Sequence, residues 1–362
     1  MTTSATVPAG PAHTMRPELA GTAARTLVRC RDLVRPSLSA ALERLHEWPG
    51  EMAAYSLGWC EVGGTPTEGA VEGKGVRQAL AVLSAEAVGA SGESALAGAV
   101  AVELVHTFSL LHDDIMDGDG MRRQRETVWK AYGTGPAVLA GDALLALAVQ
   151  VLAETPGPHA AAAVGRLSGT LTGLVRGQAE DLLFASRPWT GPDAVRPGEY
   201  RAMAELKTGT LLGCAAALGG LLGGAPPRTV AALDRAGRHL GVAFQAVDDL
   251  LGIWGDPAVT GKPVHSDLRQ RKKTCPVLAA LAGGGRHARE LAALLDAPLP
   301  LDDAGAVRAT ALVEACGGRT ATLEEARRHL DAAHGCLRGV PLAPRAAYEI
   351  EGLLEFLLHR EV

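Results

Sequence analysis

The sequence predicts an all-α protein built as a single large helical bundle. Of its 362 residues 47% are hydrophobic and only 4% are aromatic, and the abundant alanine and leucine are among the strongest helix formers. Apolar residues recur with helical spacing, whereas no stretch alternates long enough to build a sheet. No segment repeats at a fixed period. We therefore expect helices that pack closely through small side chains.

The segments follow in order from a polar N-terminal tail. Residues 1–22 are rich in Thr, Ala, Pro and Gly without periodic apolar positions, so we expect a disordered tail, or less readily a docking peptide for an unknown partner. The helical domain covers 23–362 and begins with a helix at 25–48, followed by a glycine-rich loop at 61–75. Turn residues separate the later segments. Further helices are expected at 76–89, 93–118, 135–154, 158–185, 197–224 and 228–253, with shorter ones after the polar segment 255–273 and a last one at 341–360.

Charge and cysteine content argue against several classes of protein. The net charge is −5 with acidic and basic residues mixed, so no basic stripe indicates a nucleic-acid partner. The six cysteines show no C-x-x-C spacing and no signal peptide is evident, which favours a reduced, cytoplasmic location. The uncharged stretch 208–227 is long enough to cross a bilayer, but its six glycines favour a packed core helix. We expect no integral membrane protein.

Three aspartates lie near the C-terminal end of the helix expected at 93–118. Asp113 and Asp117 are four residues apart and share one face, with Asp114 about 100° round the helix. Carboxylates at this end oppose the helix dipole and repel one another. Bound Mg²⁺ would offset both costs, since Mg²⁺ prefers carboxylate and phosphate oxygens. The alternative is a solvated helix end.

Basic residues follow this cluster, and a second acidic pair lies more than a hundred residues later. Arg122 and Arg123 have the fork geometry that binds phosphate oxygens; surface ion pairs with nearby acidic residues are the alternative. The second pair is Asp248-Asp249. Together the two clusters predict a site in which metal ions hold a diphosphate.

Three stretches of the chain resemble the trans-isoprenyl diphosphate synthases, the polyprenyl synthetase family. They are LLHDDIMDGDGMRR, GTGPAVLAGDALLALA and FQAVDDLLGIWGDPAVTGKPVHSDLRQRKKTCPV. The resemblance runs from residue 73 to about residue 280 and continues more weakly to the C-terminus. It implies the isoprenoid synthase fold, an all-α bundle around a central cavity, and a homodimer. It also implies ionisation of an allylic diphosphate on three Mg²⁺ ions, attack by isopentenyl diphosphate and loss of a proton.

The resemblance also assigns roles by motif position. The metal ligands would be Asp113, Asp117 and Asp248, with Asp114 and Lys207 also catalytic and Asp249 nearby. The isopentenyl diphosphate site would comprise Lys74, Arg77, His106 and Arg123. The allylic diphosphate site would comprise Arg122, Lys207, Thr208, Gln245 and Lys262. Each residue taken alone has an ordinary structural explanation, and only their joint order carries the assignment.

The second cluster departs from the family pattern at Gly252, where a third aspartate is usual. We expect an active enzyme that needs more Mg²⁺ than a Gly252→Asp variant. Product length is expected to depend on Phe108 and Ser109, five and four residues before Asp113, because a growing chain passes along that helix face. This pattern resembles archaeal geranylgeranyl diphosphate synthases, so we expect a twenty-carbon product, with farnesyl diphosphate second.

Three other functions stay open at this point. A class I terpene cyclase shares the fold but needs no isopentenyl diphosphate site, and Lys74, Arg77, His106 and Arg123 argue against it. An irregular prenyltransferase would join two allylic units. A non-catalytic subunit of a hetero-oligomeric prenyl synthase is favoured only by Gly252.

Overall fold

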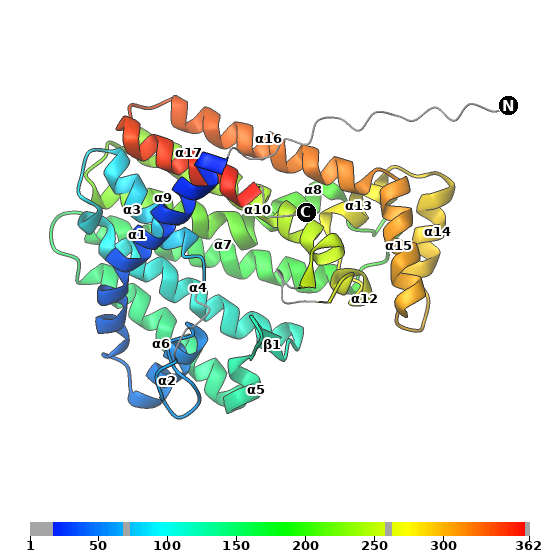
Figure 1. Ribbon diagram of the computed structural model, residues 1–362, viewed down its shortest axis with the longest axis horizontal. Coiled ribbons are helices and arrows are strands. Elements are labelled where there is room, and N and C mark those ends of the chain that lie inside the picture. Colours follow the sequence, from blue (N-terminus) through cyan, green and yellow to red (C-terminus); the bar gives the residue numbers. More distant parts are fainter. Residues whose placement is uncertain (1–16, 68–72, 258–262, 359–362) are drawn as a thin grey trace.

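A computed structural model describes residues 17–67, 73–257 and 263–358 (Figure 1). The sequence expectation of an all-α bundle is confirmed. The helices are α1 Pro17–Leu42, α2 Glu47–Ser56, α3 Val76–Ala87, η1 Gly92–Ala95, α4 Leu96–Asp117, α5 Val128–Tyr132, α6 Thr134–Ala153, α7 Ala160–Ser186, α8 Pro197–Ala204, η2 Glu205–Gly209, α9 Thr210–Leu222, α10 Pro227–Trp254, α12 Ser266–Arg269, α13 Cys275–Ala282, α14 Gly285–Leu295, α15 Asp303–Ala315, α16 Gly318–Arg338 and α17 Pro344–Leu358.

Two expected boundaries at the N-terminal end are wrong. Helix α1 begins at Pro17, inside the segment expected to be disordered, while residues 1–16 lie outside the described residues. The helix expected at 25–48 ends at Leu42, and α2 starts at Glu47. The break is stabilised by His46, whose Nδ1 accepts a hydrogen bond from the Trp48 backbone N–H at 3.3 Å. A side chain that caps the first turn satisfies an otherwise unpaired donor.

The core is a set of long helices that pack side by side. Helix α10 packs against α9 and α16, α4 packs against α6, and α3 packs against α9. The uncharged stretch 208–227, expected to be buried, contains α9, in which Leu211, Leu212 and Leu218 are at most 1% exposed. A separate apolar cluster joins the end of α10 to α13, α14 and α15. These last two helices form one end of the elongated molecule (Figure 1).

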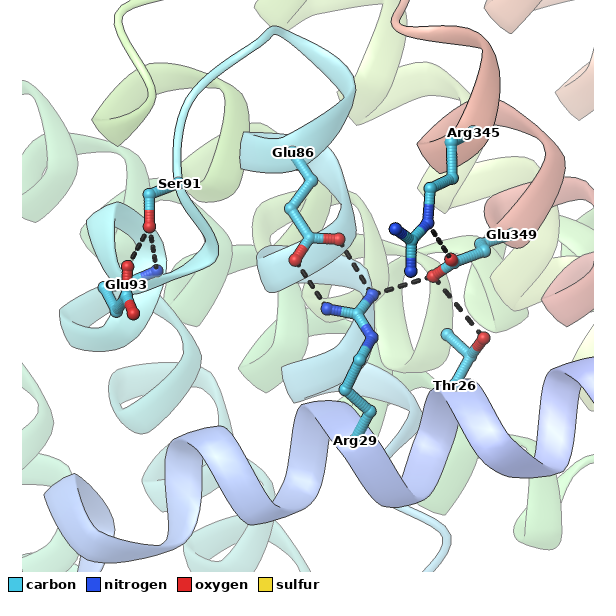
Figure 2. A network of polar contacts seen from close by, with 7 residues as sticks. All are labelled: Thr26, Arg29, Glu86, Ser91, Glu93, Arg345 and Glu349. Atoms are coloured by element: carbon cyan, nitrogen blue, oxygen red, sulfur yellow. Dashed lines mark hydrogen bonds and ion pairs between the residues drawn. The ribbon is translucent and has the colours of Figure 1, made fainter.

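Helix α1 is fastened to both α3 and α17 by a network of ion pairs (Figure 2). Arg29 Nη1 donates to Glu86 Oε1 at 2.6 Å, and Arg29 Nη2 donates to Glu349 Oε2 at 2.7 Å. Arg345 Nε donates to the other oxygen of Glu349 at 3.1 Å. Burial opposes ionisation of Glu349, but these hydrogen bonds lower its pKa on balance. The network therefore joins the N-terminal and C-terminal helices.

Two helical stretches among the described residues are long and apolar enough to span a membrane on length and composition alone. They are Gly92–Asp117 and Thr134–Ala153, with 61% and 39% of their most apolar windows buried inside the protein. Core helices of soluble proteins pass the same test, so two such stretches are weak evidence. The second stretch, α6, leaves Val138, Leu139 and Val149 exposed.

Candidate active site

The two acidic clusters lie near the C-terminal ends of α4 and α10. Helix α4 ends because Gly118 adopts a left-handed conformation at φ 69° and its N–H bonds back to the Ile115 carbonyl at 3.3 Å; glycine adopts this conformation without steric cost. The chain then turns through a short antiparallel hairpin, β1 (Met121–Arg122) and β2 (Arg125–Glu126). The sequence analysis did not anticipate these strands. They bring Arg122 back onto the end of α4.

Arg122 forms a two-pronged ion pair with Asp114. Its Nη2 donates to Asp114 Oδ1 at 2.6 Å, and its Nε donates to Oδ2 at 3.1 Å. Asp114 is 5% exposed; burial raises the pKa of its carboxyl, and Arg122 opposes that rise. Both carboxylate oxygens of Asp114 therefore face Arg122, while Asp113 and Asp117 project elsewhere on the helix. This geometry gives Asp114 a supporting position beside the expected metal ligands.

Asp113 is a strongly perturbed carboxyl group. Burial raises its pKa to about 6; Lys207 opposes this, while Asp117 and Asp181 reinforce it. A buried carboxylate next to other carboxylates favours either a proton or a cation. Oxygen donors of this type suit Mg²⁺, which usually takes one or two carboxylates and completes its shell with phosphate oxygens and water. Within the described residues no three His, Cys, Asp or Glu side chains converge on a protein-only metal site.

Lys207 reaches the site from a π-helical segment, η2, between α8 and α9. The sequence analysis expected one unbroken helix at 197–224 and missed this bulge, which is a common device for redirecting side chains at functional sites. Lys207 Nζ donates to Asp181 Oδ2 at 2.6 Å. Burial lowers the pKa of Lys207, but the negative charges of Asp181 and Asp113 together raise it by more, so the net shift is upward. Lys207 is held as a cation beside Asp113.

Two glycines position the backbone of η2 between its neighbouring helices. A Cβ at Gly177 on α7 would lie 2.4 Å from Lys207 N, and a Cβ at Gly241 on α10 would lie 2.3 Å from the Cα of Gly209. Both distances are far below any real carbon contact. The absence of a side chain at these positions therefore lets η2 sit directly against α7 and α10.

A chain of hydrogen bonds fixes the wall formed by α10. Thr208 Oγ1 donates to Gln245 Oε1 at 2.9 Å, and Gln245 Nε2 donates to Asp249 Oδ1 at 3.0 Å. The other oxygen of Asp249 accepts from the Tyr200 hydroxyl and, at 2.8 Å, from the Cys275 backbone N–H. Burial raises the pKa of Asp249 to about 7 despite these bonds. Asp249 therefore links α10 to the segments that carry Tyr200 and Cys275. Tyr200 is a supporting residue that the sequence analysis missed.

A lysine that the sequence analysis missed joins the two walls. Lys272 Nζ donates to Asp117 Oδ2 at 3.1 Å. Burial lowers the pKa of Lys272, and Asp117 and Asp267 more than offset that effect. No local pattern singles out Lys272, because its partner lies far away in the sequence. Lys262, the basic residue expected near the second wall, lies outside the described residues.

The residues expected to bind isopentenyl diphosphate include His106, which lies two turns before Asp113 on the same face of α4. Arg77 Nη1 donates to His106 Nε2 at 3.1 Å, which leaves His106 neutral. Burial lowers the pKa of His106, and Arg77 and Arg123 lower it further. The Arg123 guanidinium lies against Gly73, where a Cβ would be 2.9 Å from Nη2. Lys74 follows and lies over the Phe356 ring of α17 at 5.4 Å. Arg77 and Arg123 thus come from two separate segments to lie near His106, on a third.

The two residues expected to control product length lie one turn before the aspartates. Phe108 is buried and meets His112 edge to face, with ring centroids 4.8 Å apart. Ser109 Oγ donates to the His106 carbonyl at 2.8 Å. The role of both residues in product length stays a prediction.

Three comparisons with known proteins identify the family of the chain. The family described as Polyprenyl synthetase matches residues 66–303. The (2E,6E)-farnesyl diphosphate synthase of Mycobacterium tuberculosis is 44% identical over 91% of each chain, and the geranylgeranyl diphosphate synthase of that species is 43% identical over 92% of this chain and 93% of its own. The crystal structure of polyprenyl synthetase from Streptomyces coelicolor A3(2) is similar with a TM-score of 0.85 and 47% identity, covering 92% of this chain and 99% of that one. The chain therefore belongs to the polyprenyl synthetase family of prenyltransferases.

Proposed function

We propose that this chain is a short-chain trans-prenyltransferase that joins isopentenyl diphosphate to an allylic diphosphate. The observation that carries the proposal is the presence of cations at two places along α4. Lys207 lies beside Asp113, and Arg77 and Arg123 lie around His106, two turns earlier. Two anion-binding groups fit a reaction with two diphosphate substrates, since each group neutralises the phosphates of one substrate.

The allylic diphosphate is assigned to the space between the two acidic walls. Asp113, Asp117 and Asp248 would hold Mg²⁺ there, with three ions when the substrate is bound. Bound Mg²⁺ supplies the positive charge that stabilises the departing diphosphate. Lys207 adds a fixed ammonium group, and charge placed in advance where negative charge develops is usually the largest catalytic contribution.

Isopentenyl diphosphate is assigned to the basic group at Lys74, Arg77, His106 and Arg123. Arg123 stays charged although burial lowers its pKa, because an arginine side chain does not lose its proton in proteins. The neutral His106 accepts from Arg77 and so orients that guanidinium. A terpene cyclase would have no use for a second site of this kind, which separates the two functions.

Geranylgeranyl diphosphate is the product we favour, with farnesyl diphosphate second. The support for twenty carbons is the single aromatic residue Phe108, five residues before Asp113, and the likeness to geranylgeranyl pyrophosphate synthetase from Pyrococcus horikoshii Ot3, with a TM-score of 0.82 and 30% identity over 95% of this chain and all of that one. One mycobacterial relative is named for farnesyl diphosphate and the other for geranylgeranyl diphosphate, so they support the reaction more than a particular chain length of its product.

The working form proposed is a cytoplasmic homodimer. The exposed apolar side chains Val138 and Leu139 on α6 and Val175 and Leu183 on α7 support it, since exposed apolar surface of this kind often marks a protein interface. A second subunit would cover these side chains without a membrane.

Incubation with isopentenyl diphosphate and Mg²⁺ tests the reaction. Each allylic diphosphate of five, ten or fifteen carbons is supplied in turn, and the products are sized after dephosphorylation. The proposal expects linear prenyl alcohols of fifteen or twenty carbons that require both substrates. Cyclic hydrocarbons formed without isopentenyl diphosphate would favour the cyclase, products joining two allylic units would favour the irregular enzyme, and no product with any substrate would favour a non-catalytic subunit.

A further inference from the structure

The space next to Gly252 is filled by a carboxylate from another element. A Cβ built on Gly252 would lie 1.9 Å from Asp267 Oδ2, 2.4 Å from Asp267 Cγ and 2.9 Å from Asp267 Oδ1. These distances are too short for any side chain to coexist with the carboxylate in this position. The carboxylate of Asp267 therefore occupies the space where a side chain at position 252 would begin, on the wall formed by α10.

Packing against α10 holds the backbone that carries Asp267 in this position. Asp267 belongs to α12, which packs against α10. Ser266 Oγ donates to the Gly252 carbonyl at 3.2 Å, and the Lys272 backbone N–H donates to the Asp267 carbonyl at 2.9 Å. The next residue, Leu268, is 1% exposed and lies in the same apolar cluster as Ile253 of α10. Helix α12 is thus anchored on the end of α10 by apolar and polar contacts together.

The surroundings of Asp267 are those of the metal wall. Its charge contributes to raising the pKa of Asp249, after the larger effect of burial, and it helps to hold Lys272 as a cation. Lys272 in turn bonds to Asp117 on the opposite wall. Asp267 therefore belongs to the same electrostatic network as both aspartate clusters.

We propose that Asp267 supplies the third carboxylate of the second acidic wall, in the space that Gly252 leaves open, and holds Mg²⁺ there together with Asp248. The inference rests on the proposed function, because that function places the ion at this wall. It also changes the expectation for Gly252: the wall lacks no carboxylate, and adding one at position 252 forces two carboxylates into the same space.

Metal binding without turnover tests this assignment. Free Mn²⁺ is measured by electron paramagnetic resonance in the presence of full-length protein and inorganic pyrophosphate. Asp267→Asn keeps the shape of the side chain and is expected to weaken Mn²⁺ binding about 10- to 100-fold, the range typical for loss of a group that supports a metal site. The matched control is Asp303→Asn, because Asp303 also contacts α12, through Arg269 at 2.8 Å, but is 94% exposed. The control is expected to bind Mn²⁺ as the wild type does.

A swap of the two residues tests the shared space independently. Gly252→Asp alone is expected to lower the melting temperature of the metal-free protein, because the new side chain collides with Asp267. Adding Asp267→Ala to it removes the collision and moves the carboxylate onto α10. The double variant is expected to regain both the melting temperature and most of the Mn²⁺ affinity.

Two results would overturn the assignment. One is wild-type Mn²⁺ binding by Asp267→Asn; the other is a Gly252→Asp protein as stable as the wild type. If Asp267→Asn does not fold, the swap decides, and a double variant that folds without regaining Mn²⁺ affinity counts against the proposal. Failure of the proposed function is a different observation, namely no prenyl product from the wild-type protein, whereas Mn²⁺ binding is measured without any reaction.

Discussion

Replacing Gly177 by alanine is expected to displace the backbone that carries Lys207. The new Cβ would lie 2.4 Å from Lys207 N and 2.8 Å from the carbonyl carbon of Leu206, whereas ordinary contact begins near 3.4 Å. Backbone cannot rotate away as a side chain does, so η2 or α7 must shift by about 1 Å, a misplacement that can cost on the order of 100-fold in rate. The Lys207–Asp181 ion pair at 2.6 Å would be disturbed by the same shift.

Stability is expected to respond less than activity. Overpacking costs about 1–3 kcal/mol, but alanine in a helix recovers about 0.5–1 kcal/mol relative to glycine. The assay is kcat/KM for the allylic diphosphate at saturating Mg²⁺, alongside urea unfolding. Gly335→Ala on α16 is the control, because a Cβ there meets nothing within 4 Å; it should leave kcat/KM unchanged and raise stability slightly. Wild-type kcat/KM in Gly177→Ala would refute the claim that this close approach positions Lys207.

Four further predictions concern product length, pH and assembly. Phe108→Ala should lengthen the product because it removes the bulky ring on the path of the growing chain, and an unchanged product distribution would argue against Phe108 as the floor. The pKa of Asp113 is about 6 without metal, so apparent Mg²⁺ affinity should fall as the pH drops through 6, and a flat Mg²⁺ titration between pH 7.5 and about 5.5 would contradict this. Burial and His239 lower the pKa of His329 from 6.5 to about 4, so the protein keeps its full stability above pH 6.5, where this histidine is neutral in both the folded and the unfolded state. The melting temperature should fall as the pH drops from 6.5 towards 4, and the melting temperature of His329→Gln should fall less steeply. Leu139→Glu should convert a dimer into monomers in sedimentation experiments, and a wild-type sedimentation profile would place the interface elsewhere.

Local chemistry made most of the fold and one wall of the site predictable. The helix at 93–118 and its three aspartates follow from spacing alone, and the buried stretch in α9 follows from its composition. The same reasoning failed at Leu42, where the first helix ends and His46 caps a new helix that begins at Glu47. It also failed at the hairpin around Arg122, because strands of two residues carry no visible alternation.

The missed site residues share a physical reason. Asp181, Lys272 and Asp267 each act through a partner on a distant segment, and such contacts exist only after the helices pack. Gly252 looked like a lost carboxylate in the sequence; the fold places Asp267 in that space.

The most direct test of the central claim compares the wild-type protein with Asp113→Asn in a prenyl-transfer assay. Radiolabelled isopentenyl diphosphate, the ten-carbon allylic diphosphate and Mg²⁺ are supplied, and label in the extracted prenyl diphosphate is counted. If the walls of α4 and α10 carry the reaction, the wild type incorporates label only when Mg²⁺ is present. The rate of the variant should then be at least about 100-fold lower, as expected when a group that stabilises developing charge is removed. Equal incorporation by the two proteins, or incorporation without a divalent cation, would contradict the account.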